Sequence, residues 1–370
     1  QISVSKTPSP ASLPEPGGEF TFTYVVTNDS VETVTLTSVT DDVIGTITLP
    51  SDVTLAPGES SAAMTGTKTY TDAGTYPNVV TAKAVDNEGN EDTATDDASV
   101  TVTDELPDIS VSKTPSPASL PEPGGLFTFT YVVTNDSVET VTLTSVTDDV
   151  IGTITLPSDV TLSPGESSDP MTGTKTYTDA GVYPNTVTAI AYDNEGNEGT
   201  ATDDASVTVD DVLPKVSITK VADPTVLPEP GGRFDYVIVV TNDSVEAITL
   251  SELTDTLPGG AVVYDLAAAG VVLPPGGTYT WKPFQTYTEA GFYTDEAHVI
   301  AYDNEENKAE ARATATVEVT DELPQISVSK TPSPASLPEP GGEFTFTYVV
   351  TNDSVETVTL TSVTDDVIGT

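Results

Sequence analysis

The sequence predicts an all-β protein made of tandem Ig-like β-sandwich domains, with about seven strands each, joined in a linear array. Two observations support this prediction. The chain repeats itself at intervals of roughly 107 residues. Within each repeat, short runs of alternating apolar and polar residues are separated by proline and glycine, and helical spacing is missing.

The internal repeats define the expected domain organisation. The segment that begins Ile2-Ser-Val-Ser-Lys recurs from Ile109, in altered form from Val216, and unaltered from Ile326. The predicted domains are residues 1–107, 108–214 and 215–324, the last divergent, followed by a partial copy of the first at residues 325–370. The partial copy ends in the middle of a repeat. We therefore expect a longer, near-periodic chain, or, as the alternative, a partial copy that completes a neighbouring molecule by strand donation.

Alternation of residue type predicts the strands. Phe20, Phe22 and Tyr24 alternate with threonine, which is typical of a half-buried strand. In the first repeat the predicted strands cover residues 2–6, 20–24, 31–41, 46–49, 64–70, 76–85 and 98–103. A repeat of this length can bury its own core, so we expect each one to fold as a unit.

A local motif supports the Ig-like prediction. Asp72-Ala-Gly-Thr-Tyr76 recurs as Asp179-Ala-Gly-Val-Tyr183 and as Glu289-Ala-Gly-Phe-Tyr293. This motif resembles the Asp-x-Gly-x-Tyr of Ig-like domains, where the tyrosine hydroxyl ties the corner before the penultimate strand. We expect a buried structural tyrosine at each of the three positions.

A wider resemblance covers all the repeats. Phe20-Thr-Phe-Thr-Tyr-Val-Val-Thr-Asn28, followed by Thr-Leu-Thr-Ser-Val-Thr-Asp41, resembles the surface repeat of bacteria and archaea that has a TVTN…TVTDTLP pattern. The third repeat is closer still, with Val239-Val-Thr-Asn242 and Leu253-Thr-Asp-Thr-Leu-Pro258. The resemblance implies an Ig-like, extracellular, tandemly arrayed domain of a large surface protein, and it implies no common activity.

Composition argues against several functions. The 370 residues include 58 Asp and Glu against 12 Lys and Arg, a formal net charge of −46. Such an acidic surface repels nucleic acid and anionic membranes. Cysteine is absent, and a Ser-His-Asp mechanism would have to use the single histidine, His298. No apolar run is long enough to span a bilayer, and no signal peptide is visible. We expect no enzyme.

Acidic residues gather at the joins between repeats and in the loop before each last strand. In an Ig-like sandwich the chain enters at the end that carries this loop, so the two acidic segments should meet. Ca²⁺ prefers such carboxylate ligands, and junctional Ca²⁺ would stiffen the array. The candidate ligands are Asp104, Glu105, Asp136, Asp193 and Glu195 at the first join, and Asp210, Asp211, Asp243, Asp303 and Glu305 at the second. Plain hydrated loops are the simpler interpretation.

Asn-Asp-Ser sequons recur on a predicted turn. They place candidate glycosylation sites at Asn28, Asn135, Asn242 and Asn352. Ordinary turn chemistry explains the same residues.

One lysine position also recurs. Lys6, Lys113, Lys220 and Lys330 occupy the same place on the first strand of each repeat. The favoured interpretation is a surface lysine with acidic neighbours. The alternative is a Lys–Asn crosslink of the kind found in Ig-like surface domains, with Asn78, Asn185 or, in the third repeat, Asp295 as partner.

These observations together predict a structural extracellular protein that forms a stalk, fibre or filament on a prokaryotic cell surface by self-association. The joins are short and contain proline, which favours stiffness and a rod. One alternative is an adhesin for a carbohydrate or a protein, with Tyr279, Trp281 and Phe284 of the divergent repeat as candidate contacts. Another is a filament of separate subunits joined by strand donation.

Overall fold

The computed structural model describes residues 1–51, 53–158 and 160–369, so Thr370 of the partial copy lies outside the described residues. Within this part of the chain the regular elements are strands, and no helix there is long and apolar enough to cross a membrane. The chain divides into two compact units. The first comprises Gln1–Leu120, Gly125–Tyr177 and Val182–Thr208, and the second comprises Pro121–Gly124, Thr178–Gly181 and Val209–Thr370.

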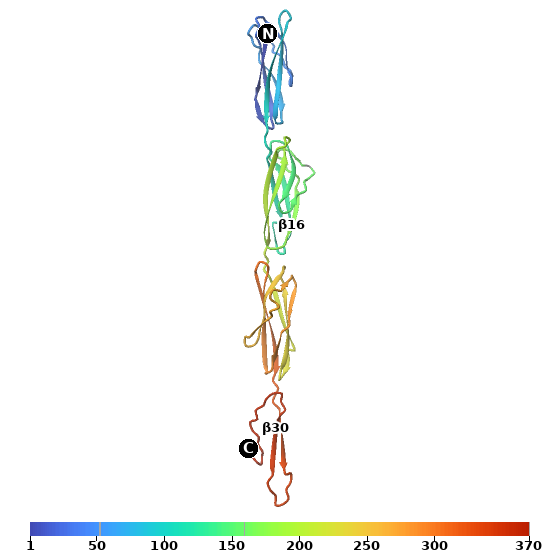
Figure 1. The fold of residues 1–370 in the computed structure, drawn as a ribbon, viewed down its shortest axis with the longest axis vertical. Helices are drawn as coiled ribbons and strands as arrows, with labels where there is room; N and C mark the ends of the chain where they lie inside the picture. The colour runs from blue at the N-terminus through green and yellow to red at the C-terminus, as the bar shows by residue number, and fades with distance from the viewer. Residues whose placement is uncertain (52, 159, 370) are drawn as a thin grey trace. The chain divides into compact units, whose positions relative to one another are not determined.

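The first repeat forms two sheets, shown in blue in Figure 1. One sheet has the order β1-β3-β7, and the other has the order β2-β9-β8-β4-β5, with β6 paired to β4. The strands are β1 (Ile2–Ser9), β2 (Ser12–Pro14), β3 (Gly18–Asn28), β4 (Val34–Asp41), β5 (Gly45–Thr46), β6 (Thr54–Leu55), β7 (Met64–Tyr70), β8 (Gly74–Val85) and β9 (Glu91–Thr103). Neighbouring long strands are antiparallel, whereas the short β2 runs parallel to β9.

A single hydrophobic core lies between the two sheets. Alternate side chains of β3 point inward, and Phe20, Phe22 and Tyr24 are completely buried. Val39 of β4 and Val80 of β8 meet them from the other sheet. Each large apolar side chain buried in this way contributes about 1.5–3 kcal/mol. The repeat is therefore a β-sandwich that closes around its own core.

The second repeat has the same arrangement, with sheets β10-β12-β16 and β11-β18-β17-β13-β14 and with β15 on β13. Its strands are β10 (Ile109–Ser116), β11 (Ser119–Pro121), β12 (Gly125–Asn135), β13 (Val141–Asp148), β14 (Gly152–Thr153), β15 (Thr161–Leu162), β16 (Met171–Tyr177), β17 (Gly181–Tyr192) and β18 (Glu198–Asp210). Each strand begins and ends at the position that corresponds to its counterpart in the first repeat. The near-identical sequence thus gives the same fold twice.

The third repeat differs most at one strand. Its strands are β19 (Val216–Asp223), β20 (Val226–Pro228), β21 (Gly232–Asn242), β22 (Ile248–Thr256), β23 (Val262–Tyr264), β24 (Val272–Leu273), β25 (Thr278–Trp281), β26 (Phe284–Tyr287), β27 (Gly291–Tyr302) and β28 (Lys308–Thr320). The counterpart of β7 is split into β25 and β26, both paired with β21. Pro283 lies at the break, where it cannot donate to the ladder.

The all-β tandem-sandwich prediction is confirmed, with local corrections. The strand predicted at residues 46–49 is mostly wrong, because β5 ends at Thr46. The short strands β2 and β6 were not predicted, since two or three residues give no periodic signal. The hydrogen bond of the predicted tyrosine corner is confirmed in the first and third repeats: the hydroxyls of Tyr76 and Tyr293 each donate to the carbonyl four residues earlier, at 2.7 Å. The prediction that these tyrosines are buried is wrong, because Tyr76, Tyr183 and Tyr293 are only half-buried.

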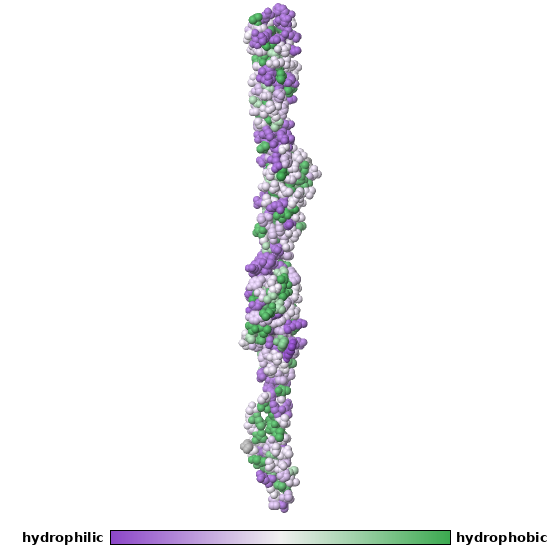
Figure 2. All heavy atoms as spheres, in the orientation of Figure 1, coloured by the Kyte–Doolittle hydropathy of each residue, from purple (hydrophilic) through white to green (hydrophobic). Residues whose placement is uncertain are grey.

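The partial copy forms one two-stranded sheet of β29 (Ile326–Ser333) and β30 (Thr345–Asn352). Side chains that are buried in the first repeat are exposed here. Ile326 is 56% exposed, whereas its counterpart Ile2 is 5% exposed. Figure 2 shows the resulting hydrophobic surface on this part of the chain.

Candidate metal sites at the joins and a buried lysine cluster in each sandwich

Four carboxylates converge where the first repeat meets the second. Glu15 and Asp104 come from the first repeat, and Glu139 and Glu195 come from the second. One oxygen from each lies within 4.8 Å of the others. All four residues belong to the first compact unit.

Glu15 is fixed by the loop between β2 and β3. Its carboxylate accepts hydrogen bonds from the backbone N–H of Ala73, at 2.8 Å, and of Glu105, at 3.1 Å. The loop turns at Gly17, whose φ is +67° and whose added Cβ would lie 2.0 Å from the carbonyl oxygen of Tyr70. Only glycine fits at this position, so the Pro-Glu-Pro-Gly-Gly segment serves to place Glu15 at the join.

The second repeat meets the join through the loop between β17 and β18. Asp193 closes this loop, because its carboxylate accepts from the backbone N–H of Asn197 at 2.7 Å and from Asn197 Nδ2 at 2.9 Å. The same Asn197 Nδ2 donates to Asp104 at 2.9 Å. The join and this loop therefore meet, as the Ig-like topology predicts.

Glu139 is the least compensated of the four carboxylates. Its Oε1 is buried and has no hydrogen-bond partner among the described residues. Burial raises the pKa of Glu139 to about 7, and the negative charges of Glu15 and Glu195 add to the effect. A buried oxygen without a donor is expensive, so this group is suited to binding a proton or a cation.

The same arrangement recurs at the other joins. At the second join, which lies in the second compact unit, the corresponding carboxylates are Glu122, Asp211, Glu246 and Glu305. Burial raises the pKa of Glu246 to about 7, and Glu122 and Glu305 add to the shift. A smaller group at the third join, Glu229, Asp321 and Glu356, occupies equivalent positions. Glu32, Asp86 and Glu88 form another group within the first repeat, and Asp86 there takes the position of Asp193.

The predicted ligands divide into two sets. Asp104, Glu195, Asp211 and Glu305 belong to the carboxylate groups, whereas Glu105, Asp136, Asp193, Asp210, Asp243 and Asp303 do not. Asp193 and Asp303 close their loops instead, and Glu105 contributes only its backbone N–H. Sequence reasoning missed Glu15 and Glu139 with their counterparts. Their recurrence at fixed places in Pro-Glu-Pro-Gly-Gly and Asn-Asp-Ser-Val-Glu was the available signal.

The donor set fits Ca²⁺. This ion takes six to eight oxygen ligands at about 2.3–2.6 Å, so two ligand oxygens on opposite sides are at most about 5 Å apart. The observed limit of 4.8 Å agrees with oxygens around one such ion. Glu139 Oε1 would also gain the partner that it lacks.

The raised pKa values predict a pH effect on stability. Glu139 and Glu246 have a pKa of about 7 in the folded protein, above the ordinary carboxyl value of 4.5. The folded state therefore binds more protons than the unfolded state between these values, and stability should increase as the pH falls from 8 to 5.5. Melting temperatures measured in chelator should rise over this range. In the double variant Glu139→Gln and Glu246→Gln the rise should shrink, and an unchanged rise would contradict the assignment.

The structure argues against glycosylation at the first three sequons. Asn28, Asn135 and Asn242 are completely buried. The Nδ2 of Asn28 donates to the carbonyl oxygens of Glu32, at 2.7 Å, and Leu55, at 2.9 Å. A glycan on this atom would break both bonds and has no space, so these residues serve the turn. Asn352 in the partial copy is exposed, and its Nδ2 donates to the Glu356 carbonyl at 2.8 Å.

The expectation of a surface lysine is wrong for the first three repeats. The side chains of Lys6 and Asp41 are 0% exposed, and Lys6 Nζ lies 3.0 Å from Asp41 Oδ2. Lys6 Nζ also contacts Oδ1 of Asn78, which is 1% exposed. Below the ammonium lies the ring of Phe22, with its centroid at 5.0 Å. Lys6 thus lies in a dry, aromatic environment between the two sheets.

The polar groups around Lys6 differ in whether their hydrogen bonds are complete. Asp41 Oδ2 accepts from the Tyr24 hydroxyl at 2.6 Å, and Asp41 Oδ1 accepts from the backbone N–H groups of Val43 and Ile44. Burial raises the pKa of Asp41, but these hydrogen bonds and the contact with Lys6 lower it overall. In contrast, Asn78 Nδ2 is buried without an acceptor among the described residues. Such a donor costs about 1–3 kcal/mol.

The cluster recurs with one change. In the second repeat Lys113, Asp148 and Asn185 have the same contacts, and the distance from Lys113 Nζ to Asp148 Oδ2 is 3.0 Å. In the third repeat Lys220 Nζ contacts Asp255 Oδ1 and lies 3.6 Å from Oδ2 of Asp295, which replaces the asparagine. Burial, the largest influence, raises the pKa of Asp255.

The fold and these sites define the class of the molecule: an all-β chain of tandem sandwiches with acidic joins. No protein-family model matches the sequence, and no curated protein matches it. Among solved structures, the chain is similar to part of a 1.5-MDa bacterial ice-binding adhesin, with 14% identity, 87% of this chain and 98% of that chain covered, and a TM-score of 0.29.

Two further solved structures show comparable similarity. A Ca²⁺-stabilised, ice-binding adhesin of an Antarctic bacterium has 16% identity, with 89% of this chain and 76% of that chain covered and a TM-score of 0.27. A putative membrane-anchored protein from Corynebacterium diphtheriae has 13% identity, with 84% of this chain and 95% of that chain covered and a TM-score of 0.25.

Proposed function

We propose that this chain is part of an extracellular structural protein whose tandem sandwiches set distance from a prokaryotic cell surface, with Ca²⁺ bound at the joins. The observation that carries the proposal is the recurrence of one carboxylate group, shared between neighbouring repeats, at two successive joins. Each sandwich buries core residues of its own, so only the joins are needed to connect the repeats into a linear array.

Ca²⁺ would couple neighbouring repeats because its ligands come from both sides of the join. At the first join, Glu15 and Asp104 belong to one sandwich, and Glu139 and Glu195 belong to the next. Without a cation the negative charges of these carboxylates repel one another and favour separation. With a cation bound, separation of the repeats would require loss of ligands. The join would then transmit bending from one sandwich to the next, as a stiff spacer requires.

Ca²⁺ should therefore stabilise the protein. At a hundredfold excess over its Kd, each bound ion is expected to add about 2.7 kcal/mol. Titration calorimetry should detect binding, and chelator should lower the melting temperature. Glu195→Gln should weaken binding at the first join and Glu305→Gln at the second, whereas Asp204→Asn, an exposed carboxylate on β18, should leave both unchanged. Absence of binding in the wild type would refute the Ca²⁺ part of the proposal.

Location provides a separate test of the structural role. Antibodies raised against the chain should label intact, unpermeabilised cells of its source, and immuno-electron microscopy should place the label away from the envelope. Labelling that appears only after cell lysis would refute the surface function, whatever the result with Ca²⁺.

The ligand-binding alternative receives less support from the divergent repeat. Tyr279 and Trp281 are half-buried and pack against the core of the third sandwich. The Tyr279 hydroxyl also donates to Asp265 at 2.7 Å. Of the three candidate aromatics, Phe284 alone is exposed, and the Arg233 guanidinium covers its ring at 4.0 Å.

A further inference from the structure

We propose that each complete sandwich forms an internal amide crosslink between its buried lysine and the side chain opposite. The bonds join Lys6 to Asn78, Lys113 to Asn185 and Lys220 to Asp295. This modification is independent of the surface function and of Ca²⁺, because the cluster lies inside each sandwich and shares no residue with the joins.

The geometry brings the reacting groups together from three strands. Lys6 lies on β1, Asp41 on β4 and Asn78 on β8, so the crosslink would connect the two sheets. Lys6 Nζ already contacts the side-chain amide of Asn78 and lies 3.0 Å from the Asp41 carboxylate. Reacting atoms held within about 3.5 Å are in a near-attack arrangement, which removes most of the entropic barrier.

The reaction needs no oxidant or external reagent. Asp41 accepts a proton from the Lys6 ammonium, and the neutral amine attacks Cγ of Asn78. The new C–N bond forms while the original C–N bond of the Asn78 amide breaks. A second proton passes from the attacking nitrogen to the leaving amino group through the same carboxyl group. The departing ammonia takes the first proton back from Asp41 and leaves as ammonium, so Asp41 is a carboxylate again.

The unsatisfied amide of Asn78 favours this outcome. Its Nδ2 is a buried donor with no acceptor among the described residues. Condensation expels this nitrogen and converts the buried ammonium into a neutral amide. Both changes remove a polar group that a dry core tolerates poorly. The second repeat has the same unsatisfied atom at Asn185 Nδ2.

In the third repeat the lysine nitrogen would attack a carboxyl group, that of Asp295, instead of an asparagine amide. Lys220 and Asp295 would lose water instead of ammonia, with Asp255 as the proton carrier. Burial raises the pKa of Asp255, which favours its protonated form. Asp255 Oδ2 and Asp295 Oδ2 are both buried without hydrogen-bond partners in the described structure, as expected for groups placed for reaction rather than for stable pairing.

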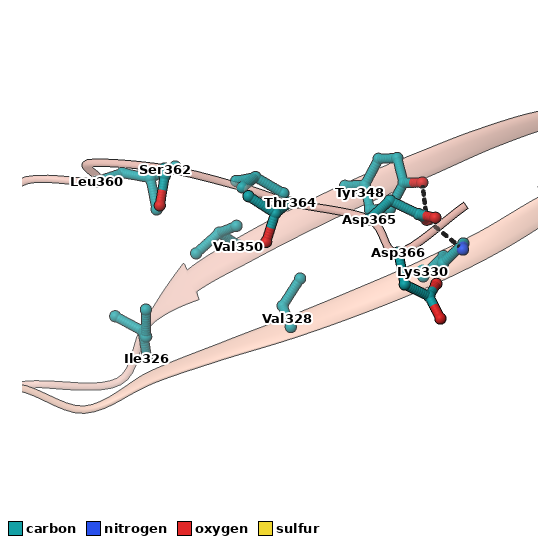
Figure 3. Close-up of a pocket in the computed structure, with 11 residues that line it drawn as sticks. Ile326, Val328, Lys330, Tyr348, Val350, Leu360, Ser362, Thr364, Asp365 and Asp366 are labelled. Atoms are coloured by element: carbon teal, nitrogen blue, oxygen red, sulfur yellow. Dashed lines mark hydrogen bonds and ion pairs between the residues drawn. The ribbon is translucent and has the colours of Figure 1, made fainter. Parts of the chain in front are cut away.

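The partial copy repeats the lysine side of the cluster. Lys330, Tyr348 and Asp365 form the same contacts as Lys6, Tyr24 and Asp41, as Figure 3 shows. Residues 325–370 match residues 1–46 and hold no counterpart of Asn78. The contact between this lysine and its carboxylate thus forms in residues 325–370 without the acceptor side chain, so it does not depend on the acceptor.

The test is mass spectrometry of the intact, folded chain. Each of the first two crosslinks should lower the mass by about 17 Da and the third by about 18 Da, relative to the sequence. The mass alone does not locate the bonds, so tandem mass spectrometry of digests must find the branched peptides Lys6–Asn78, Lys113–Asn185 and Lys220–Asp295. A folded wild-type chain without any branched peptide would overturn the proposal.

Variants separate the reaction from folding. Lys6→Arg keeps the charge and cannot condense, so the first branched peptide should disappear while the other two remain. Lys68→Arg, at an exposed lysine on β7, should change nothing. Asn78→Asp keeps the shape and should replace the loss of ammonia by a loss of water. If Asn78→Asp is folded by circular dichroism and yet unlinked, while the wild type is linked, Asp41 is not the general proton carrier proposed here.

Discussion

Replacement of Asp255 by alanine is expected to lower the unfolding free energy of the third sandwich by about 3–5 kcal/mol. Asp255 is 1% exposed and contacts Lys220, whose side chain is 0% exposed. Removal of one partner leaves the other polar group buried without full compensation, and this is where the large cost arises. The crosslink to Asp295 would be lost as well, which adds to the effect.

The chain offers a specific reporter for this experiment. Trp281 is the single tryptophan of the sequence and packs against the core of the third sandwich. Denaturant unfolding followed by its fluorescence therefore reports on that repeat within the full chain. Asp235→Ala is the matched control, because Asp235 pairs with Arg233 at the surface, where both side chains are more than half exposed. The control should cost less than about 1 kcal/mol. Equal effects of the two substitutions would refute the assigned role of Asp255.

The sequence predicted the sandwich well because its signals are local. Threonine alternating with Phe20, Phe22 and Tyr24 specifies both a strand and its buried face. The same alternation also indicates that Lys6 is buried, because Ile2, Val4 and Lys6 share one face of β1. The expectation of a surface lysine followed the general rule that lysine is exposed instead of this pattern, and the rule is wrong here.

The carboxylate groups at the joins were predicted only in part, for a physical reason. The topology of an Ig-like sandwich places Asp104 near the loop of Glu195, so these two residues were found. Glu15 reaches the join through hydrogen bonds to Ala73 and Glu105, which lie 58 and 90 residues away in sequence. Contacts of this range depend on the complete fold, and no local pattern specifies them.

The proposed crosslinks should also change how the protein responds to force. The chain enters the first sandwich at β1 and leaves it at β9, which pairs with β8 along its length. A bond between Lys6 and Asn78 would connect β1 to β8 directly, so residues 7–77 between them would carry no load. Force would pass through the short segments outside this loop.

Single-molecule pulling can measure this effect. At about 3.6 Å per extended residue, the extensible chain is roughly 12 nm long in a linked repeat and roughly 38 nm long in an unlinked repeat. Each unfolding step equals this length minus the folded length of the repeat. The wild type should therefore show no long step from its three complete sandwiches. Lys6→Arg should introduce one long step, and Lys68→Arg should introduce none. Long steps in the wild type would show that the lysines remain unlinked, whereas short steps that survive Lys6→Arg would show that another interaction holds the first sandwich.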